Sequence, residues 1–268
     1  MKPSLLIRRS FWQLRHGGLP WLARTIYNLF WPARPALTTA IQAAVQDRAG
    51  LEIGGPSRLF SAGKMLPAYS WARSIDNVNF ASQTAWETGL REGGAFLFDA
   101  GKPPGRQYLR EASCLTGIAD AAYDFVLSSH CLEHTANPLA ALREWRRTVR
   151  PGGHLVLLLP DPAATFDHRR PVTTLEHLQA DYAAQTSEAD LTQLAEILSL
   201  HDLRRDPLAG TREQFHARSL RNPENRCLHH HVFDLALMRA ALEETGWAVV
   251  GIESVRPIHL LALARNPA

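Results

Sequence analysis

The stretch DFVLSSHCLEHTANPLAALREWRRTVRPGGHLVLLLP, residues 124–160, indicates the fold of this chain. Segments 123–129 and 154–160 are apolar runs of strand length, and the second is apolar on both faces, as is typical of a central parallel strand. Between them, Asn137-Pro138 is a favourable helix start, and apolar residues then recur on one helical face until a Pro-Gly-Gly triplet. The stretch therefore predicts a strand, a helix and a second buried strand.

The same alternation continues on both sides of this stretch. Helices are expected at 38–49, 174–184, 188–200 and 233–245. Strands are expected just before Gly54 and at 71–76, 107–112, 247–254 and 258–264. A short link around Arg256-Pro257 joins the last two, which predicts an antiparallel hairpin at the end of the sheet. Strands that alternate with helices predict a three-layer α/β sandwich with a mainly parallel sheet.

The composition excludes several classes of protein. The chain has 268 residues, of which 46% are hydrophobic and 21% charged, the balance of a soluble globular protein with one or two cores. Three cysteines at irregular spacing do not suit a disulfide framework or a four-cysteine zinc site. No apolar run reaches the ~18 residues that a membrane-spanning helix needs.

Charge is unevenly distributed along the chain. Together with the pattern of strands and helices, it suggests three parts: an arm, a core and an insertion. Residues 1–35 form an arm with six basic, six aromatic and no acidic residues, which suits either a membrane surface or packing on the main domain. The rest of the chain holds 23 basic against 26 acidic residues, which disfavours nucleic acid as a partner. We expect a core from 36–160 and 233–268, and a polar, helical substrate-cap insertion at 161–232.

Glycines and acidic residues follow the predicted strands, where ligands bind in sheets of this kind. Gly54 and Gly55 come after the first strand and allow a ligand to approach the backbone closely. Asp76 ends the predicted second strand and offers two oxygens to the hydroxyls of a ribose. Glu111 and Ala112 follow the third strand, where they can meet an adenine edge.

With these positions and the stretch 124–160, the chain resembles the class I S-adenosylmethionine-dependent methyltransferases, in particular the type 11-like family with its LEHxxxP and LxPGGxLxxxxP segments. The resemblance covers residues 40–160 and 233–264. It implies a Rossmann-like sandwich whose mainly parallel, seven-stranded sheet has an antiparallel last strand. It also implies S-adenosylmethionine as the cofactor.

The glycine loop is where the chain departs from the family pattern. Glu52 and Gly54 match, but Pro56 and Arg58 stand where further glycines are usual. The resemblance implies cofactor-binding roles for residues along the strand ends, namely Glu52, Gly54, Gly55, Asp76, Glu111, Ala112 and Ser129. Glu52 and Gly54 would line the methionine end of the cofactor. Asp76 would bind the ribose, and Glu111 or the backbone of Ala112 would contact the adenine.

Histidines are the candidate catalytic residues. The sulfonium is already an activated methyl donor, so the enzyme has to align the acceptor and remove the proton of a hydroxyl, for which histidine suits neutral pH. His130 is best placed, because it directly follows the strand 123–129 and would lie beside the transferred methyl. His168, in a charged turn of the insertion, is the second candidate.

Two segments of the insertion resemble a narrower group. TFDHRRPVTTLEHLQADY and NRCLHHHVFD are similar to methyltransferases associated with bacterial surface-polysaccharide gene clusters. This similarity implies a small-molecule or glycan acceptor, namely a hydroxyl on a sugar or lipid-linked saccharide. It also implies a cytoplasmic enzyme whose residues 1–35 contact the inner face of the membrane. The oligomeric state is left open.

Alternatives to this interpretation remain open. The altered glycine loop also fits a catalytically silent module that binds a partner. His130 to His134 matches the HxxEH pattern of inverted zinc proteases, but it directly follows a strand rather than lying inside a long helix. Some methyltransferases hold a divalent ion with a Glu-His pair at this spot, and Glu133 and His134 with His168 or His229 offer ligands for one. We predict no metal site from the sequence.

Overall fold

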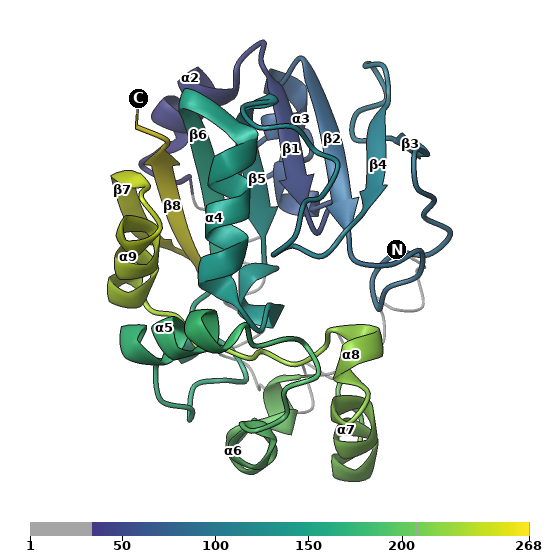
Figure 1. Cartoon of the computed structure of the whole chain (residues 1–268), viewed down its shortest axis with the longest axis vertical. Coiled ribbons are helices and arrows are strands. Elements are labelled where there is room, and N and C mark those ends of the chain that lie inside the picture. Colours follow the sequence, from purple (N-terminus) through teal and green to yellow (C-terminus); the bar gives the residue numbers. More distant parts are fainter. Residues whose placement is uncertain (1–33, 207, 268) are drawn as a thin grey trace.

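A computed structural model of the chain describes residues 34–206 and 208–267. Its centre is a single eight-stranded sheet in the order β3-β4-β2-β1-β5-β6-β8-β7 (Figure 1). The strands are β1 (Ala49–Ile53), β2 (Ser74–Asn79), β3 (Ala95–Phe96), β4 (Gly105–Leu109), β5 (Tyr123–Ser129), β6 (Val149–Pro160), β7 (Ala248–Val255) and β8 (His259–Arg265).

The directions of the strands confirm the predicted fold class. β4, β2, β1, β5 and β6 run parallel, β8 pairs antiparallel with β6, and β7 pairs antiparallel with β8. The predicted hairpin is therefore present, with its last strand inserted between β6 and β7. The two-residue strand β3, which pairs antiparallel with β4, brings the expected seven strands to eight.

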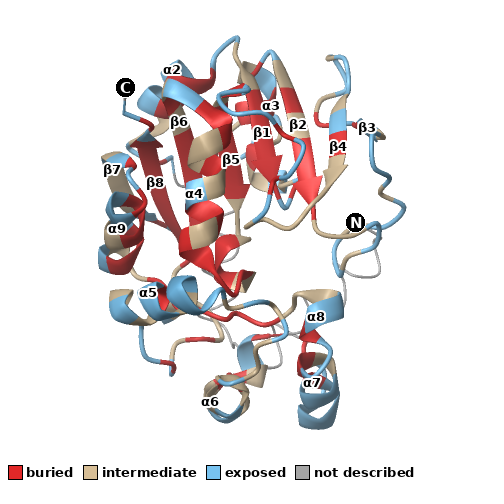
Figure 2. Cartoon of the chain, viewed as in Figure 1, coloured by how far each residue is buried: buried red, intermediate tan, exposed pale blue. Residues whose placement is uncertain are grey.

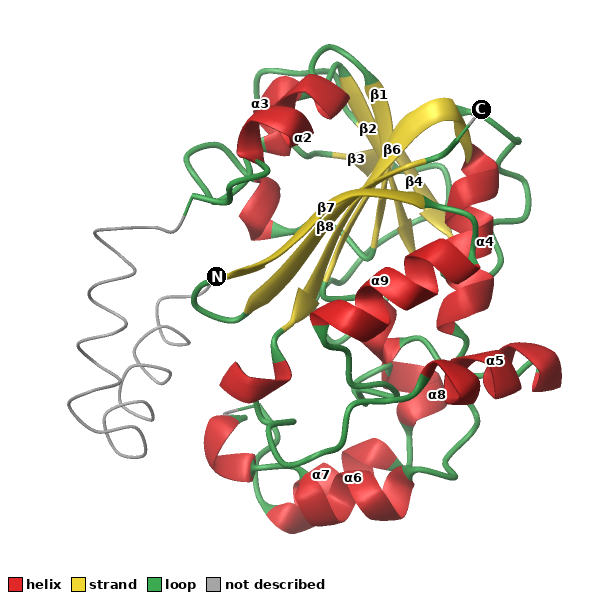
Figure 3. Ribbon diagram, turned by 90° about the vertical axis from the view of Figure 1, so that its left-hand side faces the viewer, coloured by secondary structure: helices red, strands yellow, loops and turns green. Residues whose placement is uncertain are grey.

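Helices cover both faces of the sheet, which makes three layers (Figure 3). The short helices α2 (Thr38–Val45) and α3 (Ala68–Trp71) lie on one face, and α4 (Pro138–Thr148) and α9 (Leu235–Glu244) lie on the other. Each face has its own apolar core, and the central strands β5 and β6 contribute side chains to both. This two-sided burial explains why each strand contains consecutive apolar residues, 125–127 in β5 and 155–159 in β6 (Figure 2).

Helix α4, which lies in the stretch 124–160, begins and packs as its sequence predicts. Asn137 caps α4 by accepting a hydrogen bond from the backbone N–H of Ala140 at 3.0 Å, with Pro138 in the first turn. The side chains of Leu139, Leu142 and Trp145 on its apolar face are almost fully buried against the sheet. The predicted face is therefore the one that the fold buries.

The segment 161–232 lies beyond the carboxyl ends of the central strands (Figure 1). It contains α5 (Leu175–Ala184), α6 (Leu194–Leu200), α7 (Arg212–Ser219) and α8 (Asn222–Asn225). A small apolar core of its own forms around Ile197, Phe215 and Leu228. The insertion is thus a helical layer set on the end of the sheet where ligands of α/β proteins bind.

Some predicted boundaries differ from the structure. The second strand, expected at 71–76, lies at Ser74–Asn79, because Trp71 belongs to α3 and packs with that helix on the sheet. The helix expected at 188–200 covers only Leu194–Leu200. The interpretation of residues 1–35 as a membrane-contacting arm falls almost wholly outside the described residues. No described helix is long and apolar enough to cross a membrane.

Candidate active site

A pocket of about 490 Å³ lies at the carboxyl ends of β1, β2, β4 and β5. Residues that directly follow these strands line it, among them Gly54 after β1, Phe80 after β2 and His130 after β5. The insertion contributes Glu188 and Arg226. The pocket therefore lies between the strand ends and the helical layer above them.

The loop after β1 is held from beneath by a buried carboxyl group. Glu52 is fully buried and accepts hydrogen bonds from the backbone N–H of Ser57 at 2.9 Å and from the hydroxyl of Tyr69 at 2.7 Å. Burial raises the pKa of Glu52 to about 8, although both hydrogen bonds lower it. Glu52 does not line the pocket; it positions the loop whose Gly54 does.

Asparagines of β2 hold the other side of the same loop. Asn77 accepts a hydrogen bond from the backbone N–H of Gly55 at 3.0 Å, and the side chains of Asn77 and Asn79 donate to its carbonyl at 3.1 Å. A Cβ atom at Gly55 would lie 2.3 Å from Cδ of Glu52, so only glycine fits without displacement. Pro56 lines the pocket without closing it.

Asp76 does not lie at the strand end that the sequence analysis assigned to it. It lies within β2, where its carboxylate accepts hydrogen bonds from the backbone N–H of Arg106 and the hydroxyl of Tyr123, both at 2.7 Å. It does not line the pocket, and β2 ends at Asn79 instead. The ribose assignment of Asp76 is therefore corrected, because the strand begins three residues later than its sequence suggested.

Glu111 and Ala112 line the pocket after β4. The indole N–H of the buried Trp145 donates to the carbonyl of Ala112 at 2.9 Å and so fixes this turn from below. Glu111 forms an ion pair with Arg226, whose guanidinium also lies over the ring of Phe80 at 4.8 Å from its centroid. Arg226 was not anticipated, since nothing in its local sequence distinguishes it.

Ser129 and His130 line the pocket at the end of β5. His130 has a left-handed backbone with φ of +52°, which is uncommon for a residue with a side chain and typical of functional turns. Its Nε2 lies 2.8 Å from Nδ1 of His259, so one ring nitrogen donates to the other. Burial, with smaller contributions from His259 and His229, lowers the pKa of His130 to about 3.

Behind His130 lies a group of imidazoles around one buried carboxylate. His130 is followed by a single 3-10 turn, Leu132–His134, so the HxxEH residues do not share a long helix and the protease interpretation does not apply. Oε1 of Glu133 lies 3.8 Å from Nδ1 of His130, 3.9 Å from Nε2 of His134 and 4.0 Å from Nε2 of His229. Burial raises the pKa of Glu133 to about 7. The group offers ligands for a metal ion.

His168, the second catalytic candidate, lies away from the pocket lining. Its Nε2 lies 3.1 Å from Oδ2 of Asp202, which also contacts Arg169 at 3.3 Å. The charged turn is thus engaged by an acidic residue of the insertion itself. The structure does not bring His168 together with Ser129 and His130.

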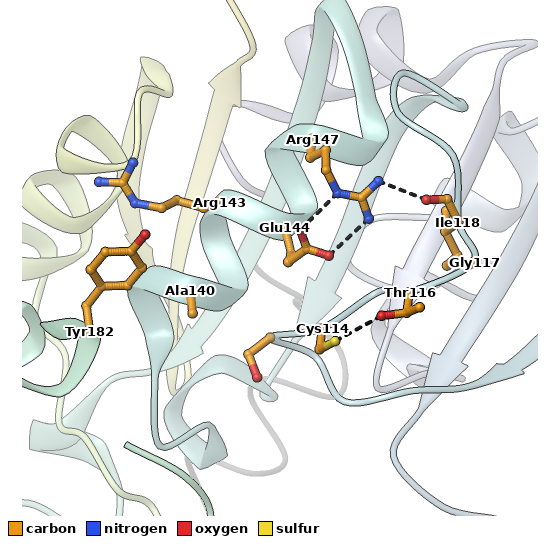
Figure 4. A pocket seen from close by; sticks show the side chains of 10 residues that line it. Cys114, Thr116, Gly117, Ile118, Ala140, Arg143, Glu144, Arg147 and Tyr182 are labelled. Carbon is orange, nitrogen blue, oxygen red and sulfur yellow. Dashed lines mark hydrogen bonds and ion pairs between the residues drawn. The ribbon is translucent and has the colours of Figure 1, made fainter. Parts of the chain in front are cut away.

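A second cavity of about 520 Å³ lies beside α4 (Figure 4). Its most prominent charge, Arg147, is already bound to the carboxylates of Glu144 and Asp120 and to the carbonyl of Ile118. This cavity shares no lining residue with the strand-end pocket. Because its arginine is satisfied internally and no strand ends there, we assign the site to the strand-end pocket.

A family model for the methyltransferase domain matches residues 35–252. The chain belongs to the methyltransferase-domain family. As a member it is an enzyme, an S-adenosylmethionine-dependent methyltransferase, and S-adenosylmethionine is its cofactor. A search of curated proteins finds no significant match.

Solved structures of methyltransferases are similar to this chain at low sequence identity. An S-adenosylmethionine-dependent methyltransferase from Mesorhizobium loti is 15% identical, with 86% of this chain and 98% of that chain covered and a TM-score of 0.46. One from Aquifex aeolicus is 13% identical, with coverages of 85% and 87% and a TM-score of 0.45. The Burkholderia thailandensis 1,6-didemethyltoxoflavin-N1-methyltransferase, solved with bound 1,6-didemethyltoxoflavin and S-adenosylhomocysteine, is 13% identical, with coverages of 99% and 89% and a TM-score of 0.46.

The pocket of this methyltransferase suits the cofactor chemically. Gly54, which has φ of +81°, lines it, and the adjacent Gly55 has no room for a side chain. Glu111 and the aromatic residues Phe80 and Trp86 also line it. Close backbone approach, an acidic group and apolar rings match a ligand that combines an amino acid, a ribose and an adenine.

Proposed function

We propose that S-adenosylmethionine binds in the strand-end pocket with its adenine beside Glu111 and Ala112 and its methyl group beside Ser129 and His130. The proposal rests on one observation: residues after four parallel strands converge on a single pocket. Gly54 of the glycine turn and the imidazoles of His130 and His134 are among the residues that line it. In this pose the methionine part follows the glycine turn.

The acceptor, in our proposal, is a hydroxyl group on a sugar or lipid-linked saccharide. Polar groups from the insertion, Glu188 and Arg226, reach the pocket, and Trp86 lines it with 55% of its surface exposed. An exposed indole face together with charged hydrogen-bonding groups suits a sugar ring, which has apolar faces and hydroxyl edges. Transfer forms a C–O bond, breaks the C–S bond of the sulfonium, leaves S-adenosylhomocysteine and passes the hydroxyl proton to His130, whose lowered pKa keeps the imidazole neutral and able to accept a proton at neutral pH.

Calorimetric titration with S-adenosylhomocysteine tests the cofactor pose. Ser129→Phe fills the pocket beside the proposed methyl position, and we expect it to weaken binding at least about tenfold. Asp76→Asn is the matched control, because Asp76 lies outside the pocket, and its affinity should stay within about twofold of the wild type. Equal affinities for the wild type and Ser129→Phe would contradict the pose.

Transfer of a radiolabelled methyl group tests the acceptor. Candidate acceptors are sugar nucleotides and polyprenyl-linked saccharides, with amino-sugar analogues for comparison. We expect label in an O-methyl saccharide and, for His130→Gln, a fall in kcat of about 10² or more with unchanged S-adenosylhomocysteine affinity. Label found only on nitrogen, or full activity of His130→Gln, would refute the hydroxyl mechanism.

A further inference from the structure

We propose that Glu133, His134 and His229 bind a divalent first-row transition-metal ion at the inner end of the strand-end pocket. One oxygen of Glu133 and one ring nitrogen of each histidine lie within 4.8 Å of one another. Two of these residues belong to the turn after β5, and His229 comes from the insertion. The three ligands therefore meet only in the folded chain.

The carboxylate of Glu133 is the first observation that points to a cation. Its side chain is 1% exposed, and within the described part of the chain neither of its oxygens has a hydrogen-bond partner. A buried carboxylate without donors is costly, because it has lost its hydration and gained no partner. The groups that face it are ring nitrogens of His130, His134 and His229 at 3.8 to 4.0 Å, which is too long for hydrogen bonds.

The two histidines are already oriented as metal ligands. Nδ1 of His134 donates to the carbonyl of Leu228 at 2.9 Å, and Nδ1 of His229 donates to Asp167 at 2.5 Å. Each hydrogen bond directs the opposite nitrogen, Nε2, toward Glu133. Metal-binding histidines are held in this way by a carbonyl or carboxylate behind the ring.

The support behind His229 is itself rigid and buried. Asp167 forms an ion pair with Arg170, whose side chain is 1% exposed, and the guanidinium of Arg170 also donates to the carbonyl of His229 at 2.8 Å. This arrangement fixes both the ring and the backbone of His229. Such a supporting carboxylate also increases the basicity of the ligand nitrogen.

The chemistry of the three ligands indicates which class of metal ion the site would bind. Two imidazoles and one carboxylate suit zinc, iron, cobalt or manganese, whereas magnesium and calcium prefer oxygen ligands alone. A tetrahedral zinc ion at ~2.0–2.1 Å from its ligands keeps them about 3.4 Å apart, so the side chains have to close by roughly half an ångström. Three protein ligands leave at least one coordination position for a substrate atom, as in catalytic zinc sites.

Of the three ligands, His134 lines the strand-end pocket and Glu133 and His229 do not, so in our proposal the open coordination position is reached from the pocket on the side of His134. The catalytic role of the ion rests on the function proposed above. When an acceptor hydroxyl coordinates the ion, its pKa falls, so its proton leaves more readily before the oxygen attacks the methyl group. Because His229 belongs to the insertion, the ion would also fasten the insertion to the core.

A second imidazole–carboxylate group, formed by His177, Asp181 and His231, serves as the comparison. There Nε2 of His231 is hydrogen-bonded to the carbonyl of Ala136 at 3.2 Å, so this nitrogen carries a proton and has no lone pair for an ion. The nitrogen of His177 is likewise engaged, at 2.7 Å from the side-chain nitrogen of Gln193. His177→Ala is therefore the control, because it removes a histidine from an imidazole–carboxylate group outside the proposed site.

Titration of chelator-treated protein with Co²⁺ and Zn²⁺ tests the site. We expect one Co²⁺ per chain, with visible absorption bands of a nitrogen–oxygen environment, and a rise in Tm of about 5–10 °C at a hundredfold excess of Zn²⁺ over its Kd. Co²⁺ binding should be lost in His229→Ala and in Glu133→Gln and kept in His177→Ala. Circular dichroism identifies any variant that fails to fold.

Several results would overturn the proposal. They are no Co²⁺ or Zn²⁺ binding by the folded wild type, binding that survives in folded His229→Ala and Glu133→Gln, and loss of binding in His177→Ala alone. Glu133→Gln removes an unpartnered buried charge, so the Tm of the metal-free variant should be higher than that of the metal-free wild type. Loss of metal binding in this variant would therefore not be caused by unfolding. S-adenosylhomocysteine affinity, measured on the same metal-free protein, reports separately on the cofactor pose.

Discussion

Replacing Glu52 with Gln removes the carboxyl group that is buried under the glycine loop. The carboxyl group is fully buried, and burial raises its pKa from 4.5 to about 8. Glutamine has the same size and can still meet Ser57 and Tyr69. Above pH 8 the substitution removes a negative charge from the site. Below pH 8 it removes the proton that Glu52 takes up on folding, and in both ranges the packing changes little.

The sign of the effect follows from the raised pKa. Between pH 4.5 and 8 the folded protein holds a proton on Glu52 that the unfolded chain has lost, so the free energy of unfolding falls as pH rises. The stability from this group is complete below the unfolded pKa and is lost as pH rises through the folded pKa. From pH 5.5 to 7.5, linkage predicts a loss of about 2.5 kcal/mol. Glu52→Gln has no such dependence.

Urea unfolding of both proteins at pH 5.5, 6.5 and 7.5 measures this difference. Other titrating groups affect both proteins alike, so their contributions cancel when the two free energies are subtracted. The Gln variant should gain about 2.5 kcal/mol relative to the wild type across this range, through a higher urea midpoint at unchanged slope. A difference that stays constant with pH would show that Glu52 is ionised in the folded protein, and would refute the reasoning.

Three further substitutions have expected outcomes. Asp76→Asn weakens its hydrogen bonds and should lower the free energy of unfolding by about 1–2 kcal/mol in urea titrations without changing S-adenosylhomocysteine affinity. Gly55→Ala brings a methyl group 2.3 Å from Cδ of Glu52, so the loop must shift, and calorimetry should give at least about tenfold weaker cofactor binding. Trp145→Phe leaves the carbonyl of Ala112 without its donor and should cost about 1–3 kcal/mol in the same titrations, whereas an unchanged midpoint would contradict this role.

Much of the fold could be predicted because its information is local. The strand at Tyr123–Ser129 and the helix start at Asn137-Pro138 were predicted within a residue. In these segments, burial on both faces of a central strand requires consecutive apolar residues, and the start of the helix requires a capping residue such as asparagine. Both features can be recognised in the sequence. The edge of the sheet is less predictable: the two-residue strand β3 and the start of β2 depend on how neighbouring segments pack.

The residues of the candidate site were likewise predictable only where their position depends on the local sequence. Gly54 and His130 directly follow strands and Glu111 comes two residues after one, so their place in the chain already predicts their place at the pocket. Asp76 shows the limit of this reasoning, since a shift of three residues in the strand moves an acidic side chain from the strand end into the sheet. His168 was selected for its chemistry alone, and its partner Asp202 lies 34 residues further along the chain.

By itself, the sequence determined the alternation of strands and helices and several of the residues that follow the strands at the pocket. Those features follow from periodicity, capping and turn chemistry, which act over a few residues, whereas the class of cofactor was implied by the resemblance of the sequence to a known family. Only the tertiary structure decided that Arg226 pairs with Glu111, and that His229, held by Asp167, faces Glu133. These contacts join residues about 60 to more than 100 positions apart in the chain, and such pairs are set by how the insertion packs over the strand ends.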